Sequence, residues 1–486
     1  MSSARGKLVG NSLALLANQV TQNATSFILS VSIARILGPY ELGQYTLAFT
    51  FYFIFMTLSS QGLKTLLTRE IAKTPDKLQT YLVSGTVVQI ALSLTAYTAL
   101  FLLVYLLPYR PATQTLCWIV GAALIPYGIS NVTEAIFQAQ ERMHLITIST
   151  VPIYILRLIV MFVVLKLNYS INVVGLILVV SEGIILLIEW AFILRINSPL
   201  RWTIDWQFIR EILLKVRTFL AIEGVSVFKL RMQVFFLSLL AGETVVGLYG
   251  ATVQLLQPFQ LISQSLVVAA LPSFARVNSE DTDRLQRLVE TIISVLLVVA
   301  VPLLIGFIFI GGDFLVFIYR DRQFYEAGNA LIIAGMMMIP LSITRALSYV
   351  MMAKGYERIN LRTVVSNTVI GALISIALIP PLQAIGAAVS ALIVEMSGAA
   401  QFYYVVRNRL FSLRIQNILR KPLLVGAGMV LLFLVLKALQ APITVIIIVT
   451  GAAFCMMAGL IIIQMLNLQE TLIKKIFRRA SRQTAG

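Results

Sequence analysis

Four basic side chains lie inside long apolar runs of the sequence, where a charge is costly. They are Arg157, Lys229, Arg231 and Arg345. A charge in such a run usually faces a polar interior or pairs with an opposite charge. Guanidinium groups can bind two phosphate oxygens at once, so these cations favour a binding site for an anionic, phosphate-bearing ligand. In the competing interpretation each cation forms a structural ion pair, and Glu134 is one available carboxylate partner.

Carboxylates also interrupt the apolar runs. We assign four of them as candidate ion-coupling groups for H⁺ or Na⁺: Glu182, Glu189, Glu223 and Glu395. Glu182 and Glu189 are two helical turns apart and therefore share one face of a helix. A carboxylate in a cavity of low dielectric constant can exchange a proton near neutral pH. Structural pairing with the four cations is the alternative role for each of them.

Amide side chains form polar stripes on two further segments. Asn18 and Gln22 are one turn apart in the first half, and Gln254 and Gln257 are one turn apart in the second. These amides could bind sugar hydroxyls in a wet cavity, or they could form hydrogen bonds between helices. The single histidine and the two separated cysteines provide no metal-ligand spacing. We therefore predict no catalytic residue, no metal site and no cofactor, and we expect a protein that is not an enzyme.

The composition identifies the elements that hold these residues. The chain of 486 residues is 59% hydrophobic and 12% charged, and its mean hydropathy is +0.90. Soluble domains carry about 25% charged residues. We predict an all-α integral membrane protein with about 14 transmembrane helices, each about 20 residues or longer. The predicted spans are 11–34, 42–63, 78–109, 111–133, 145–166, 171–194, 215–240, 244–275, 291–312, 327–352, 361–380, 384–406, 422–440 and 443–466.

The basic residues predict the orientation of the chain in the membrane. The 38 Lys and Arg residues concentrate in alternate connecting segments and in the C-terminal tail. Cytoplasmic segments of membrane proteins are enriched in Lys and Arg, so both termini are predicted to be cytoplasmic. The net charge of +17 therefore indicates orientation and not the binding of nucleic acid.

Two short motifs indicate an internal duplication. "LGPYELGQY" at 37–45 recurs as "AGETVVGLY" at 241–249, and we interpret it as a turn with Gly38 as a left-handed cap. "AQERMHLIT" at 139–147 aligns with "GYERINLRT" at 355–363, which pairs Glu141 with Glu357. Both repeats recur after six predicted helices, so the two halves have parallel orientation. We predict two six-helix lobes at 1–200 and 201–410, two additional helices at 411–466, and a basic cytoplasmic tail at 467–486.

Longer stretches around these motifs carry a family resemblance. They are "SIARILGPYELGQYTLAF", "LLTREIA" and "LSLLAGETVVGLYGATVQLLQPFQLISQSLVVAALPSFAR". Over roughly residues 10–410 the chain resembles the Wzx-type polysaccharide-biosynthesis flippases of the multidrug/oligosaccharidyl-lipid/polysaccharide (MOP) superfamily. The resemblance implies two six-helix lobes around a central cavity in a bacterial plasma membrane. It also implies movement of a polyprenyl-pyrophosphate-linked oligosaccharide, in the company of glycan polymerase and assembly proteins. Gln233 stands where many relatives carry Asp.

Three functions follow as hypotheses. The leading one is a secondary transporter that flips the lipid-linked oligosaccharide by alternating access of a cation-lined cavity. The sequence lacks the phosphate-binding pattern Gly-x4-Gly-Lys-Ser/Thr, which disfavours an ATP-driven pump. The first alternative is an ion-coupled multidrug exporter of the same superfamily, whose cavity would use acidic and aromatic groups. The second is a non-transporting membrane scaffold for a glycan-assembly complex.

Overall fold

The structure, a computed structural model, describes residues 2–196, 203–277, 281–460 and 462. These residues form helices and short connections, and no β-strand occurs among them. The all-α class is therefore confirmed. The helices pack into two compact units, residues 1–251 and 252–486, which we call unit 1 and unit 2. The boundary between them lies within one helix; the repeat-based lobes at 1–200 and 201–410 stay a prediction. The tail predicted at 467–486 lies outside the described residues.

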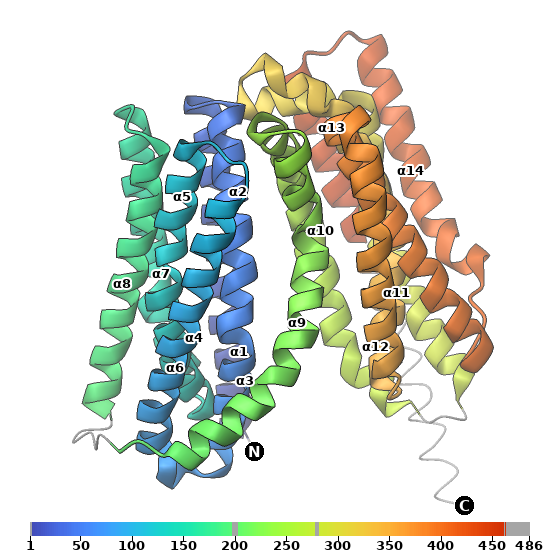
Figure 1. Cartoon of the computed structure of the whole chain (residues 1–486). Coiled ribbons are helices and arrows are strands. Elements are labelled where there is room, and N and C mark those ends of the chain that lie inside the picture. Colours follow the sequence, from blue (N-terminus) through green and yellow to red (C-terminus); the bar gives the residue numbers. More distant parts are fainter. Residues whose placement is uncertain (1, 197–202, 278–280, 461, 463–486) are drawn as a thin grey trace, which may run out of the picture. The chain divides into compact units, whose positions relative to one another are not determined.

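Unit 1 is a helical bundle in which α6 packs against α3, α4, α7 and α8 (Figure 1). Buried side chains such as Leu67, Leu82, Phe137 and Ile193 form its main apolar cluster. A π-helical turn at Thr57–Gln61 joins α2 to α3. The helices are α1 (Ser2–Ile36), α2 (Pro39–Met56), α3 (Gly62–Lys73), α4 (Leu78–Leu106), α5 (Pro111–Ala122), α6 (Leu124–Ala139), α7 (Met143–Lys166), α8 (Ile171–Ile196), α9 (Trp206–Leu240) and the first turns of α10 (Glu243–Arg276).

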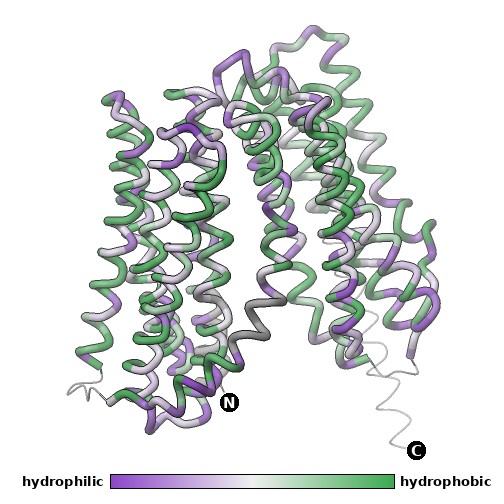
Figure 2. The backbone as a smooth tube through the Cα atoms, in the orientation of Figure 1, coloured by the Kyte–Doolittle hydropathy of each residue, from purple (hydrophilic) through white to green (hydrophobic). Residues whose placement is uncertain are grey.

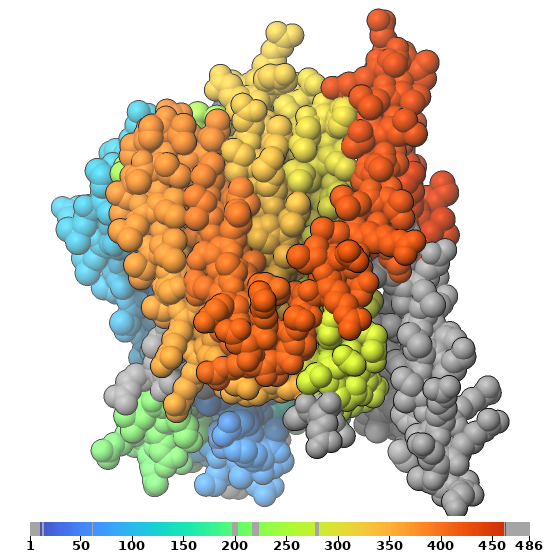
Figure 3. Space-filling model, turned by 90° about the vertical axis from the view of Figure 1, so that its right-hand side faces the viewer, coloured from blue at the N-terminus to red at the C-terminus, as the bar shows by residue number. Residues whose placement is uncertain are grey.

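Unit 2 is organised around α11, which packs against α12 and α14. Its core contains Phe274, Leu296, Leu347 and Phe402, all of which are buried. Figure 3 shows the face on which α13 is drawn in orange and α14 in orange-red. The helices are the rest of α10, α11 (Thr282–Tyr319), α12 (Gly328–Ala353), α13 (Glu357–Arg409), α14 (Ile415–Ala438) and a last helix, Ile443–Leu460.

Eleven helices in the described part of the chain are long and apolar enough to cross a membrane. The chain is therefore a multi-pass membrane protein. The predicted spans 361–380 and 384–406 are two arms of α13, which bends at Gln383 (φ 50°, ψ −123°) after Pro380 and Pro381. The helices α1 and α9 are not among the eleven, so the number of 14 spans stays a prediction. Figure 2 shows long hydrophobic stretches along the helices, as burial in lipid requires.

The two copies of the first motif fold into the same turn. Gly38 and Gly242 both have positive φ angles, 100° and 84°. The Gly38 amide donates to the Ile33 carbonyl oxygen at 3.3 Å, and the Gly242 amide donates to that of Leu237 at 3.1 Å. The next helix begins at the following residue in each case. Gly38 has a positive φ angle, which favours glycine, but its ψ angle of −176° lies outside the left-handed helical region, so the prediction of a left-handed cap is wrong in this detail.

The second pair of turns corrects our alignment of the second motif. Glu141 and Gly355 are the residues with positive φ, 57° and 79°. The amide after each donates, at 2.8 Å, to a carbonyl five residues earlier in the chain, Arg142 to Phe137 and Tyr356 to Met351. Glu141 is thus equivalent to Gly355, and its alignment with Glu357 was wrong by two residues. The shared letters Glu-Arg lie two residues later relative to the second turn, so they do not mark the residue that turns the chain.

The two copies of the first motif also touch each other within unit 1. A Cβ atom on Gly43 would lie 1.7 Å from the carbonyl oxygen of Glu243. A Cβ atom on Gly247 would lie 1.9 Å from the carbonyl oxygen of Pro39. The contact is reciprocal, since each glycine meets the first residue of the opposite helix. Gly43 and Gly247 therefore permit α2 and α10 to cross backbone against backbone, a role that the interpretation as a turn had missed.

Candidate functional site

Arg157 of α7 is held in a buried ion pair. Its Nη1 donates to Oε1 of Glu182 on α8 at 2.8 Å and to Oγ of Ser181 at 3.3 Å. The two charged side chains are only 11% and 7% exposed. The Cζ atom of Arg157 lies 4.8 Å from the centroid of the Tyr154 ring. One guanidinium nitrogen is therefore committed to Glu182 and Ser181, while a guanidinium has five N–H donors in all.

Arg157 also lines a narrow cleft in unit 1, whose free volume of about 20 Å³ has room for about one water molecule. We call it the Arg157 cleft. Residues of α1, α2, α7 and α8 contribute to its wall, and they combine a guanidinium with hydroxyl and aromatic groups. These groups have the chemistry to bind an anion, although the cleft would have to widen to admit one. The polar and aromatic lining residues are Thr25, Ser26, Tyr45, Phe49, Tyr154 and Arg157.

Arg231 of α9 has a different environment. Its Cζ atom lies 4.5 Å from the centroid of the Phe53 ring on α2. Its Nε atom is buried and has no hydrogen-bond partner among the described residues. A buried donor without an acceptor costs about 1–3 kcal/mol, which an oxygen of a bound anion would recover. Arg231 is not part of the Arg157 cleft.

The other residues that we selected on α9 lie closer to the surface. Lys229 is partly exposed and precedes Arg231 by two positions, so the two side chains point to different sides of the helix. Glu223 is exposed. Its surroundings thus differ from the buried ones of Glu182 and Glu189 on α8.

The predicted site residues of unit 2 form a separate set. Nη1 of Arg345 on α12 donates to the carbonyl oxygen of Gln260 at 2.6 Å and to Oγ of Ser263, both on α10. This cation therefore ties α12 to α10. Glu395 lies on α13, and its backbone oxygen accepts from Oγ1 of Thr344 at 3.3 Å.

Some amide side chains of the two polar stripes form hydrogen bonds with other side chains. Oδ1 of Asn18 on α1 accepts from Oγ1 of Thr150 on α7 at 3.0 Å, so Asn18 joins two helices. Gln22 lies one turn further along α1 and is partly buried. Nε2 of Gln257 donates to Oε1 of Gln254 within α10 at 3.0 Å.

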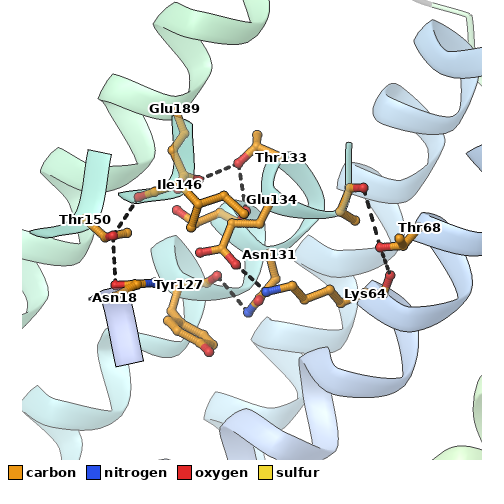
Figure 4. Close-up of polar contacts among 12 residues, drawn as sticks. Asn18, Lys64, Thr68, Tyr127, Asn131, Thr133, Glu134, Ile146, Thr150 and Glu189 are labelled. Carbon is orange, nitrogen blue, oxygen red and sulfur yellow. Dashed lines mark hydrogen bonds and ion pairs between the residues drawn. The ribbon is translucent and has the colours of Figure 1, made fainter. Parts of the chain in front are cut away.

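A polar network around α6 includes residues that the sequence did not single out (Figure 4). Lys64 of α3 forms an ion pair with Glu134 of α6. Glu189 of α8 accepts from Oγ1 of Thr133 at 2.5 Å and from Oγ of Ser149 at 3.1 Å. The sequence indicates Glu134 as an ion-pair partner, but Lys64 falls at the end of an apolar run, where a lysine gives no signal of burial. Hydroxyl residues such as Thr133 and Ser149 carry no sequence signal of this kind.

Comparison with solved structures identifies the fold. The lipid II flippase MurJ, in an inward closed conformation, matches with a TM-score of 0.73 and 13% identity, over 94% of this chain and 100% of that one. An inward-facing multidrug resistance MATE family transporter of the MOP superfamily matches with a TM-score of 0.64 and 14% identity, over 82% and 98%. A MOP superfamily transporter from Pyrococcus furiosus gives 0.59 and 13%, over 83% and 95%.

Comparison at the level of sequence identifies the family. No curated protein matches the chain. The family model "Polysaccharide biosynthesis protein" matches residues 8–278, which is more than half of the chain. The resemblance inferred from the paired motifs is therefore confirmed. The chain belongs to the polysaccharide biosynthesis protein family, and it has the fold of the MOP superfamily transporters.

Proposed function

We propose that this protein is a secondary transporter that flips a polyprenyl-pyrophosphate-linked oligosaccharide from the cytoplasmic to the outer leaflet of a bacterial plasma membrane. The flipped glycan would serve surface polysaccharide assembly, with glycan polymerase and assembly proteins as partners. The family and the similarity of the fold to a lipid II flippase support this proposal. No catalytic step is required, so the protein would act as a transporter and not as an enzyme.

The Arg157 cleft is the observation that carries the proposal. It offers a guanidinium beside hydroxyl and aromatic groups inside an apolar bundle. Guanidinium groups bind phosphate oxygens through short, charge-assisted hydrogen bonds. In the proposed cycle Arg157 and Arg231 bind phosphate oxygens of the lipid carrier, while amides and hydroxyls such as Asn18 and Thr25 bind sugar hydroxyls. The polyprenyl chain stays in the lipid, and access to the site alternates between the two faces of the membrane.

The second candidate is an ion-coupled multidrug exporter, because the fold also matches multidrug resistance transporters. Such an exporter would have to bind organic cations. The guanidinium of Arg231, whose buried Nε has no acceptor among the described residues, repels a cation instead. This observation favours the anionic substrate.

Replacing Arg231 by glutamine is expected to slow flipping about tenfold to a hundredfold. A hydrogen bond to a charged group contributes about 1.5–3 kcal/mol, and the substitution removes that contribution from the bound pyrophosphate. The measurement is the flipping of a polyprenyl-pyrophosphate oligosaccharide in proteoliposomes at matched protein insertion. Arg69→Gln is the control, because this side chain on α3 is 65% exposed.

The same proteoliposome assay, applied to the native protein, distinguishes the candidate functions. Flipping that responds to Arg231→Gln and not to Arg69→Gln supports the proposal. Flipping with unchanged rates in Arg231→Gln removes Arg231 from the site. Accumulation of a cationic dye without any flipping would favour the exporter, and neither activity would favour the scaffold.

A further inference from the structure

Glu189 is a carboxyl group buried completely in the interior of unit 1. Its two oxygens lie 2.5 Å from Oγ1 of Thr133 on α6 and 3.1 Å from Oγ of Ser149 on α7. It forms no ion pair within the described part of the chain. Lys64 of α3 is paired with Glu134 (Figure 4). An ionised Glu189 would thus be a buried charge with two hydroxyl partners and no ion pair, favoured only from a distance by Lys64, which is itself paired with Glu134, and such a charge is costly in a membrane interior.

The hydrogen-bond contacts around Glu189 distinguish its ionised form from its protonated form, because each contact needs a proton between its two oxygens. Oγ1 of Thr133 also lies 2.7 Å from the carbonyl oxygen of Ser130, and Oγ of Ser149 lies 2.9 Å from that of Ile146. A hydroxyl group has one proton to donate, and both carbonyl and carboxylate oxygens only accept. With Glu189 ionised, the hydroxyl groups of Thr133 and Ser149 supply two protons for four acceptor oxygens, namely two carbonyl oxygens and two carboxylate oxygens. One of the two short contacts of Thr133 then has no proton between its oxygens.

A single added proton resolves the shortest contact. A protonated Glu189 donates to Oγ1 of Thr133, and Thr133 is then free to donate its own proton to the carbonyl oxygen of Ser130. The other carboxyl oxygen still accepts from Ser149. A direct contact of 2.5 Å between Glu189 and Thr133 also leaves no room for a metal ion between these two oxygens. The geometry therefore favours a proton over Na⁺ at this position.

We propose that Glu189 is a proton-binding site that carries H⁺ in the conformation described here and exchanges it during the transport cycle. The proposal deepens the proposed function and rests on it for the coupling to transport. It makes H⁺ the co-substrate and selects Glu189 from the four candidate carboxylates. Thr133 accepts the hydrogen bond of the bound proton, and Ser149 is a positioning residue that holds the other carboxyl oxygen.

The other titratable groups near Glu189 have defined partners or lie elsewhere on the packed helices. Glu134 on α6 is paired with Lys64 of α3, and Arg157 on α7 is paired with Glu182 of α8 itself. Glu134 and Glu182 each have a cationic partner, whereas the side-chain contacts described for Glu189 are hydrogen bonds with hydroxyl groups. The remaining titratable groups on α5, α6 and α7 are Cys117, Tyr127, His144, Tyr154 and Lys166.

Infrared spectroscopy of the purified full-length protein tests the proton directly. We expect the native protein to show, at neutral pH, the carbonyl absorption of a protonated carboxyl group, and Glu189→Gln to lose it. Glutamine can donate from its amide to Thr133 and should preserve the fold. Glu223→Gln is the control, since Glu223 is exposed and should leave the band unchanged. A band that persists in Glu189→Gln, or is absent from the native protein, overturns the proposal.

Flipping in proteoliposomes tests the coupling. A gradient of one pH unit is worth about a tenfold accumulation per exchanged proton. We expect this accumulation in the native protein under one polarity of the gradient and its loss in Glu189→Gln, while the exposed control Arg69→Gln should accumulate the substrate as the native protein does. Accumulation driven by Na⁺ and insensitive to pH overturns the proposal. Should the native chain flip no lipid-linked oligosaccharide, the proposed function fails, while the infrared measurement still decides whether Glu189 holds the proton.

Discussion

Replacing Gly43 by alanine is expected to destabilise the protein by about 3 kcal/mol. Overpacking of a filled interior costs about 1–3 kcal/mol, and here the new methyl group would meet a backbone carbonyl oxygen 1.7 Å away. The helices α2 and α10 must therefore separate. An alanine in an open helical position would instead stabilise by up to about 1 kcal/mol. Thermal unfolding of the purified protein in detergent measures the effect.

Gly183→Ala and Gly247→Ala complete this experiment. A Cβ atom on Gly183 of α8 would meet nothing within 4 Å, so this control should unfold at or slightly above the native temperature. Gly247→Ala should destabilise as Gly43→Ala does. The double variant should lose less than the sum, because one separation of the helices makes room for both methyl groups. Equal stability of Gly43→Ala and Gly183→Ala would show that α2 and α10 do not cross at these glycines.

Gly38 and Gly43 show which parts of the fold can be predicted from the sequence. The turn at Gly38 depends on local chemistry, since a residue with positive φ before a proline favours glycine. The crossing at Gly43 depends on which helices meet, and hydropathy does not encode the pairing of distant helices. The repeated Gly-x4-Gly-x-Tyr spacing carried this signal, but the same spacing is compatible with a turn alone. The equivalence of Glu141 with Gly355 and not with Glu357 has a similar origin, because the letters Glu-Arg do not encode which residue takes a positive φ angle.

The candidate site divides along similar lines. Charges such as Arg157 and Glu182 stand out in apolar runs because burying them is costly, so they could be selected from the sequence. Which carboxylate pairs with which cation depends on the packing of α7 against α8, and several partners were compatible with the sequence. The hydroxyl donors at Glu189 could not be predicted, because Thr133 and Ser149 resemble many other residues of the helices. The separate surroundings of Arg157 and Arg231 likewise follow only from the fold.

Neutralising Arg157 and Glu182 together is expected to restore stability without restoring transport. Arg157→Met alone leaves a buried carboxylate unpaired, and breaking a buried ion pair in this way costs about 3–5 kcal/mol. Glu182→Gln alone leaves the guanidinium without its anion, with a similar cost. The double variant removes both charges, and replacement of a whole buried pair by neutral groups is often close to neutral in stability. Thermal unfolding of the two single variants and the double variant measures these differences.

Flipping by the same variants separates a structural pair from a binding site. Arg157 lines the cleft and has further N–H donors beyond the one that holds Glu182. If phosphate oxygens bind there, Glu182→Gln should keep measurable flipping, because the guanidinium is still present to bind the anion. The double variant should be as well folded as the native protein and yet flip at the rate of Arg157→Met. Recovery of flipping in the double variant would instead assign Arg157 and Glu182 to structure alone and leave Arg231 as the cation that binds the substrate.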